Sequence, residues 1–227
     1  MSKPDALYYR ITDGKIETVA EAALAAPGPR LCYIGLEDAE RLGAVLGFNA
    51  QRLTDYAAQE PRLRNSIDVY DDLSAGLISI INVADIEGPM DRIGFVITKE
   101  SFVMIKIEDL DDSVREMFLQ NVARFQNSAT MEKFIYGILE RLLSGSRRML
   151  EDMERDIMDI EQRLTDDTAD RTLNRVIYAY RKRLSTARNY YEQLIDIGEE
   201  LMENENDLFS EQGLWYFRIF VGKAERI

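Results

Sequence analysis

Residues 139–164, LERLLSGSRRMLEDMERDIMDIEQRL, carry an apolar or small side chain at every third or fourth position. These positions are Leu139, Leu142, Ser146, Leu150, Met153, Ile157, Ile160 and Leu164. A similar rhythm returns after the polar link 165–170, at Leu173, Ile177, Tyr180, Leu184, Ala187, Tyr191, Leu194 and Leu201. This spacing is typical of helices that share a packing seam. Because the link is short, the two segments are predicted to form a long antiparallel helical hairpin.

The part of the chain before this hairpin is predicted to be an α/β (α+β) domain with a mixed sheet. Apolar and β-branched runs indicate strands at residues 7–11, 31–36, 76–83, 93–98 and 102–107. Helices are expected between them, at residues 37–46 and, capped by Asn49, from there to about residue 59. The dipeptides Asp13-Gly14 and Gly88-Pro89 have the composition of turns between strands.

After Asp111 the pattern becomes helical. Ser113 and Glu116 have the spacing of a capping box at the start of a helix. A last helix is predicted at 213–227, where its apolar residues would cover an exposed side of the hairpin. No capping signal ends that helix, so we expect it to continue beyond Ile227. The predicted division is an α/β domain at 1–127, a helix pair at 128–206 and the start of a stalk helix at 207–227.

Composition excludes several classes of function. The 227 residues include 28 basic and 41 acidic side chains, a net charge of −13, which disfavours binding to nucleic acids or anionic membranes. No residue is histidine, which excludes the Ser/His/Asp triad and the HExxH zinc site, and no catalytic motif indicates an enzyme. The single cysteine, Cys32, lies in an apolar run and is predicted to be a buried thiol.

The expected cellular compartment is the cytoplasm. The first ten residues are polar and lack the apolar core of a signal peptide. The longest apolar stretch, residues 76–86, is interrupted by polar side chains and is far shorter than the ~20 residues of a spanning helix.

Several short stretches occur in an order that is similar to one known family. They are 46–55 (LGFNAQRLTD), 62–72 (RLRNSIDVYDD), 97–99 (ITK), 134–140 (FIYGILE), 153–164 (MERDIMDIEQRL), 180–184 (YRKRL) and 216–218 (YFR). Together they resemble the CorA family of divalent-cation transporters. Leu63 stands where that family has proline, and Thr54 where it has an acid. None of these motifs is specific alone, and their order carries the resemblance.

The resemblance implies a cytosolic regulatory domain of a homopentameric transporter on the cytoplasmic side of the cell membrane. The family's Gly-Met-Asn signature and its two transmembrane helices would lie beyond Ile227 and would provide the only membrane contact. The implied ligand is regulatory Mg²⁺, held weakly between subunits, and Co²⁺, Ni²⁺ or Zn²⁺ are open alternatives. Asp55 falls on the family's leading interfacial aspartate and Glu140 on the acid of a second metal site. A partner aspartate on the stalk helix would also lie beyond Ile227.

Simpler interpretations exist for each of these acids. Asp55 can be a solvated helix residue, and Glu140 can pair with the nearby Lys133 or Arg141. The acidic run 108–112 can bind a cation, but capping of the following helix explains it as well. Asp166, Asp167 and Asp170 are expected at a polar hairpin tip, and Tyr190, Tyr191, Trp215 and Phe217 are expected to pack rather than to bind a ligand.

Two other functional classes remain open from sequence. A coiled-coil adaptor or scaffold would also carry a long helix pair, and two apolar stretches beyond Ile227 would distinguish the transporter from it. A carboxylate-dependent hydrolase is the third class, although no glycine-rich phosphate loop or paired-acid motif marks a pocket.

Overall fold

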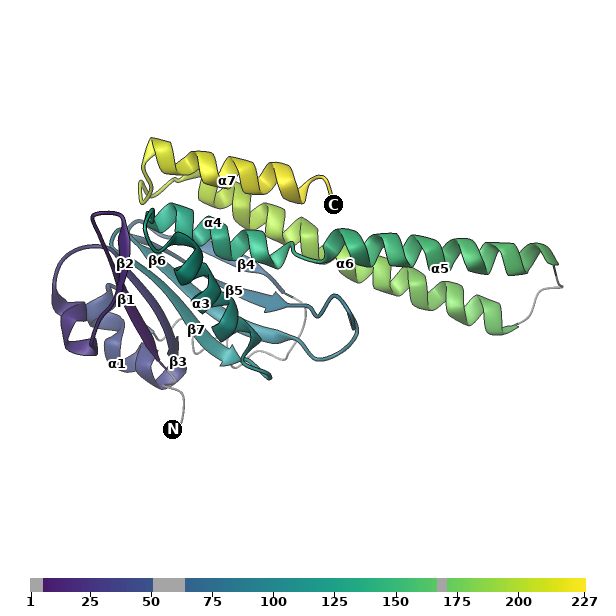
Figure 1. Ribbon diagram of the computed structural model, residues 1–227, viewed down its shortest axis with the longest axis horizontal. Helices are drawn as coiled ribbons and strands as arrows, with labels where there is room; N and C mark the ends of the chain where they lie inside the picture. The colour runs from purple at the N-terminus through teal and green to yellow at the C-terminus, as the bar shows by residue number, and fades with distance from the viewer. Residues whose placement is uncertain (1–5, 51–63, 167–170) are drawn as a thin grey trace.

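A mixed seven-stranded sheet forms the centre of the protein (Figure 1). The computed structural model describes residues 6–50, 64–166 and 171–227. The strands are β1 (Leu7–Thr12), β2 (Lys15–Thr18), β3 (Arg30–Gly35), β4 (Ser66–Val69), β5 (Leu73–Ile80), β6 (Asp91–Thr98) and β7 (Ser101–Glu108). They are ordered β2-β1-β3-β7-β6-β5-β4, with β3 and β7 parallel and the other neighbours antiparallel. The predicted mixed sheet is therefore confirmed.

The helices are distributed over both faces of the sheet. They are η1 (Glu21–Ala25), α1 (Leu36–Leu46), α3 (Ser113–Phe125), α4 (Met131–Leu142), α5 (Ser146–Asp166), α6 (Arg171–Glu203) and α7 (Glu211–Ala224). Successive residues of a strand point to opposite faces, so Leu31 and Tyr33 of β3 enter one core while Cys32 and Ile34 enter the other. The smaller core is closed by η1 and α1, and the larger by α3, α4, α6 and α7.

Local sequence explains several elements directly. The predicted face of α1 is confirmed, because Ala39, Leu42 and Leu46 are all buried. Asp13 and Gly14 both have positive φ, 50° and 73°, which suits the tight turn between β1 and β2. Cys32 is fully buried, and this burial raises the pKa of its thiol to about 12, so the thiol is uncharged at neutral pH.

The first predicted long helix is wrong in one respect, because it is two helices. α4 ends at Leu142 and α5 begins at Ser146. Gly145 between them has φ +82°, a left-handed conformation in which a Cβ atom is unfavourable. The Ser146 hydroxyl donates to the Leu143 carbonyl at 2.6 Å, so it satisfies a backbone group at the break.

The hairpin of α5 and α6 forms an arm that extends beyond the sheet (Figure 1). The second half of α6 packs on β4, and α7 lies along α6 and α4. The last helix thus covers the base of the hairpin, as expected, and starts at Glu211 after the capping hydroxyl of Ser210. The link 167–170 lies outside the described residues, and the division into units at 127/128 and 206/207 stays a prediction.

The aromatic residues of these helices mostly enter the larger core. Tyr190, Tyr191 and Phe217 are buried there, as predicted. Trp215 differs, because 59% of its surface is exposed on α7.

Candidate functional site

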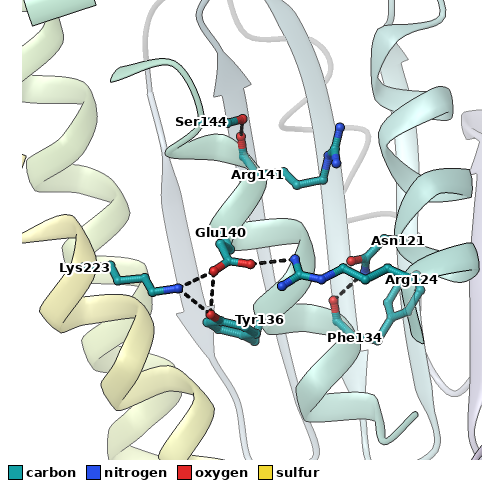
Figure 2. A network of polar contacts seen from close by, with 8 residues as sticks. All are labelled: Asn121, Arg124, Phe134, Tyr136, Glu140, Arg141, Ser144 and Lys223. Atoms are coloured by element: carbon teal, nitrogen blue, oxygen red, sulfur yellow. Dashed lines mark hydrogen bonds and ion pairs between the residues drawn. The ribbon is translucent and has the colours of Figure 1, made fainter. Parts of the chain in front are cut away.

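Glu140 lies at the centre of a polar network that joins three helices (Figure 2). One carboxylate oxygen accepts hydrogen bonds from the Tyr136 hydroxyl at 2.6 Å and from the Lys223 ammonium. The other oxygen accepts from the Arg124 guanidinium at 2.6 Å. The Lys223 ammonium also donates to the Tyr136 hydroxyl at 2.8 Å. Glu140 and Tyr136 come from α4, Arg124 from α3 and Lys223 from α7, so the network ties both neighbouring helices to α4.

The network stabilises the ionised form of Glu140. Burial alone raises the pKa of the carboxyl, but the hydrogen bonds from Lys223, Tyr136 and Arg124 outweigh it and lower the pKa to about 2. The pKa of Lys223 is raised by the same hydrogen bonds to Glu140 and Tyr136. Burial and then the bond to Glu140 raise the pKa of Tyr136. All three groups therefore keep their ordinary charges at neutral pH.

Packing beneath the network fixes α3 against α4. The buried Asn121 side chain donates from its amide to the Phe134 carbonyl at 2.8 Å. Gly137 faces Asn121 and Phe125 so closely that a Cβ atom there would overlap both side chains. Glu140 stands one turn after Gly137 on α4, so this close helix contact places the carboxylate within reach of Arg124.

The local partners suggested for Glu140 by sequence are wrong. Arg141 points away from Glu140 (Figure 2) and donates to Gln120. Lys133 donates to the carbonyl and hydroxyl of Ser128. The actual cations are far from Glu140 in sequence. A metal ion at this carboxylate would meet two positive side chains already bound to it, so metal binding there requires Lys223 or Arg124 to leave.

The leading candidate, Asp55, lies outside the described residues, as do Thr54 and most of the helix predicted there.

Three aspartates, one from β6 and two from the loop between β7 and α3, form the second acidic feature. Oxygens of Asp91, Asp109 and Asp111 lie within 4.8 Å of one another, a separation at which carboxylates can share a divalent cation. Asp91 accepts from the Ser113 hydroxyl at 2.7 Å, and Asp109 from the Tyr33 hydroxyl at 2.7 Å. The aspartates thus already organise the loop before α3.

Helix capping at α3 follows a different pattern from the one predicted. Asp109 accepts from the backbone N–H groups of Val114 at 3.2 Å and Arg115 at 3.0 Å. The predicted capping box of Ser113 and Glu116 is wrong, because Ser113 is already the first helical residue and its hydroxyl bonds to Asp91. The sequence indicated a capping role for the acidic run 108–112, and Asp109 performs it.

Within the residues that the structure describes, no helix has both the length and the apolar composition needed to cross a bilayer.

Comparison with solved structures shows the same fold in other proteins. The full-length CmaX protein superposes with a TM-score of 0.73 at 13% identity, covering 99% of this chain and 72% of that one. The complete CorA magnesium transporter from Methanocaldococcus jannaschii gives 0.73 at 12% identity, covering 100% and 71%. The ZntB cytoplasmic domain from Vibrio parahaemolyticus gives 0.65 at 14% identity, covering 97% and 93%. A comparison with curated proteins finds no match.

The sheet with its helical arm and returning α7 has the architecture of a CorA soluble domain, as the superposition on that domain from Methanocaldococcus jannaschii shows with a TM-score of 0.68. The family model described as CorA-like Mg²⁺ transporter protein matches residues 35–227. The chain belongs to this family.

Proposed function

We propose that this chain is the cytosolic regulatory domain of a CorA-like transporter of divalent cations, with Mg²⁺ as the ion it senses. The observation that carries the proposal is the family match over residues 35–227, on a fold that superposes on CorA domains. The protein assembles as a homopentamer, and its membrane contact comes from transmembrane helices that follow residue 227. The cation is cargo and regulator, and no catalytic role is proposed.

The proposed sensing site lies between neighbouring subunits at Asp55. Mg²⁺ prefers oxygen ligands and keeps several of its water molecules, so one carboxylate from each subunit is sufficient to bind it. The chain has a net charge of −13, and acidic surfaces of adjacent subunits repel each other unless a cation lies between them. Bound Mg²⁺ therefore favours a close, closed arrangement of subunits, and its loss favours a looser one.

Glu140 is the second proposed ligand, but it can bind a cation only if its present hydrogen-bond partners release it. In the arrangement of Figure 2 its carboxylate is bound by Lys223 from α7 and by Arg124 from α3. Cation binding at Glu140 then competes with Lys223 and Arg124. We propose that the site becomes available when α7, which carries Lys223, or α3, which carries Arg124, shifts relative to α4.

Transport by the full-length protein in liposomes tests the proposal. Uptake of Mg²⁺ is measured with low and with millimolar Mg²⁺ on the cytosolic side, for the wild type, Asp55→Asn and the control Asp159→Asn on the exposed face of α5. Asp55→Asn should keep transport but lose inhibition by cytosolic Mg²⁺, and the control should keep both.

Inhibition that is unchanged in Asp55→Asn would reject the sensor at Asp55 while leaving the transporter intact. A full-length protein that moves no divalent cation would reject the transporter and favour a scaffold.

A further inference from the structure

The exposed side of α6 carries an ordered gradient of charge. Eight exposed residues follow one another at alternating steps of three and four along this side, which we call the α6 stripe. They are Arg175, Tyr178, Lys182, Ser185, Asn189, Glu192, Asp196 and Glu199. The stripe is basic in its first half, neutral in its middle and acidic in its second half. It lies opposite the buried side of the helix, which includes Ala187, Leu194 and Leu201.

The charges of the stripe are complementary to those of a second stripe that runs in the opposite direction. Arg175 precedes position 187 by as many residues as Glu199 follows it, and Lys182 and Glu192 are likewise equally distant from position 187. The remaining pairs with this relation are Tyr178 with Asp196 and Ser185 with Asn189. Two antiparallel copies of α6 would therefore place basic residues against acidic ones on both sides of a two-fold axis.

We propose that the α6 stripe binds the α6 stripe of a second copy of this chain, antiparallel, with the two-fold axis beside position 187. Steps of three and four keep the stripe facing a partner helix along its length. Ser185 and Asn189 at the centre are small enough for the two backbones to approach. Tyr178, with 71% of its surface exposed, provides the largest apolar contact and can donate its hydroxyl to Asp196 of the partner subunit.

Present contacts of the stripe are compatible with this partner. Lys182 pairs with Glu87 at 2.6 Å and Glu192 with Arg188 at 2.7 Å, both between exposed side chains that exchange partners at little cost. Among the described residues, no ion pair is recorded for Arg175.

The acidic end of α6 has a local excess of negative charge. The pKa of Glu200 is raised, first by burial and then by its acidic neighbours Glu203, Glu205, Asp196 and Glu199. This repulsion is relieved when a basic segment lies alongside. The basic half of α6 is the matching segment, since residues 171–191 contain no acidic side chain.

The contact is expected to be weak and sensitive to salt, because its seam is polar and exposed. It does not depend on the transporter proposal. Neighbours in a five-membered ring meet through unlike surfaces, whereas this contact joins like surfaces and therefore lies outside such a ring.

Cysteine crosslinking of the 227-residue chain tests both the partner and its direction. Tyr178→Cys and Asp196→Cys are prepared separately and oxidised alone and as a mixture. The mixture should give disulfide-linked heterodimers, whereas each variant alone should give little dimer, because like positions lie about 27 Å apart along antiparallel helices. The native Cys32 is fully buried and does not interfere.

Dimers formed by Tyr178→Cys alone would indicate parallel helices and overturn the proposal. Equal, low yields from the mixture and from each variant alone would show that the stripes do not meet, and would also overturn it.

Charge reversal gives an independent test by sedimentation velocity. Arg175→Glu with Lys182→Glu leaves only acidic charges on the stripe, and Glu192→Lys with Glu199→Lys leaves Asp196 as the one acidic residue of an otherwise basic stripe. Each reversed chain should remain monomeric alone, and the two should associate when mixed. Raising the salt concentration about tenfold should weaken association of both the wild type and the mixture by on the order of tenfold. Reversed chains that associate as the wild type does would overturn the proposal, and helicity measured by circular dichroism confirms that they fold.

Discussion

The two halves of α6 follow one sequence rhythm in very different surroundings. In the second half, Tyr190, Leu194 and Leu201 are almost completely buried between the sheet and α7. In the first half, Tyr180 and Leu184 occupy the same kind of position but are only half-buried, where the helix pairs with α5 in the arm. The sequence periodicity thus identifies which side of a helix packs. The number of elements that cover that side determines how deeply it is buried and therefore how much it contributes to the free energy of unfolding.

The largest expected loss of stability comes from a substitution in the core against the sheet. Phe118 of α3 is fully buried and contacts the rings of Tyr9, Tyr33 and Phe134. Phe118→Ala should lower the free energy of unfolding by about 3–5 kcal/mol, measured by urea denaturation. The control Met158→Ala on the exposed arm should change it by less than about 0.5 kcal/mol. Similar losses from both would show that the arm is as deeply packed as the body.

Two helical glycines give the next largest contrast. A Cβ atom at Gly137 of α4 would overlap Asn121 and Phe125, whereas at Gly222 of α7 the nearest atom is a flexible Arg226 nitrogen at 3.8 Å. Gly137→Ala should lower the melting temperature, with a cost of about 1–3 kcal/mol. Gly222→Ala should raise it, with a gain of about 0.5–1 kcal/mol from helix propensity. Stabilisation by both substitutions would mean that α3 and α4 are less closely packed than the structure shows.

The junction between body and arm should give an intermediate effect. Gly145 has φ +82°, and a Cβ atom there would lie 3.0 Å from the Val83 side chain. Gly145→Ala should therefore destabilise the protein by about 1–2 kcal/mol. Gly145→Asn should cost less, because asparagine tolerates the left-handed conformation. Equal costs for the two, measured by urea denaturation, would shift the explanation from backbone strain to the contact with Val83.

The smallest effect concerns the polar network of Glu140, which is partly exposed. Glu140→Gln should cost about 1 kcal/mol at neutral pH, because hydrogen bonds to Lys223 and Arg124 lose their ionic partner. The pKa of Glu140 is below its ordinary value of 4.5, so the folded state gains stability from its ionised form above that value. The difference in unfolding free energy between wild type and Glu140→Gln should therefore shrink as the pH falls from about 4.5 to about 2. A difference that stays constant over this range would show that the network does not favour the ionised carboxylate.

Much of the fold was predictable, because it depends on local periodicity. The strands predicted at 93–98 and 102–107 correspond to β6 and β7, and the helical rhythm of the hairpin is confirmed. Strand β5 covers Leu73–Ile80, three residues earlier than predicted at both ends. Its end was placed too late because the apolar run continues past the strand into the following turn. The break at Gly145 was missed, because Ser146 keeps the three-four rhythm across it.

The candidate site was much less predictable. Tyr136 could have been found, since it precedes Glu140 by one helical turn. Lys223 could not, because it reaches Glu140 only through the packing of α7 on α4, and no local pattern records that contact. Asp55 rests on the family resemblance alone.

The parallel pairing of β3 with β7 sets an order of assembly during synthesis. Strands β1, β2 and β3 leave the ribosome roughly 70 residues before β7, the strand that joins them to the rest of the sheet. Until then, Leu31 and Tyr33 have no strand beside them on that edge. The edge of β3 that pairs with β7 is therefore the edge that stays unpaired longest while the chain is being made.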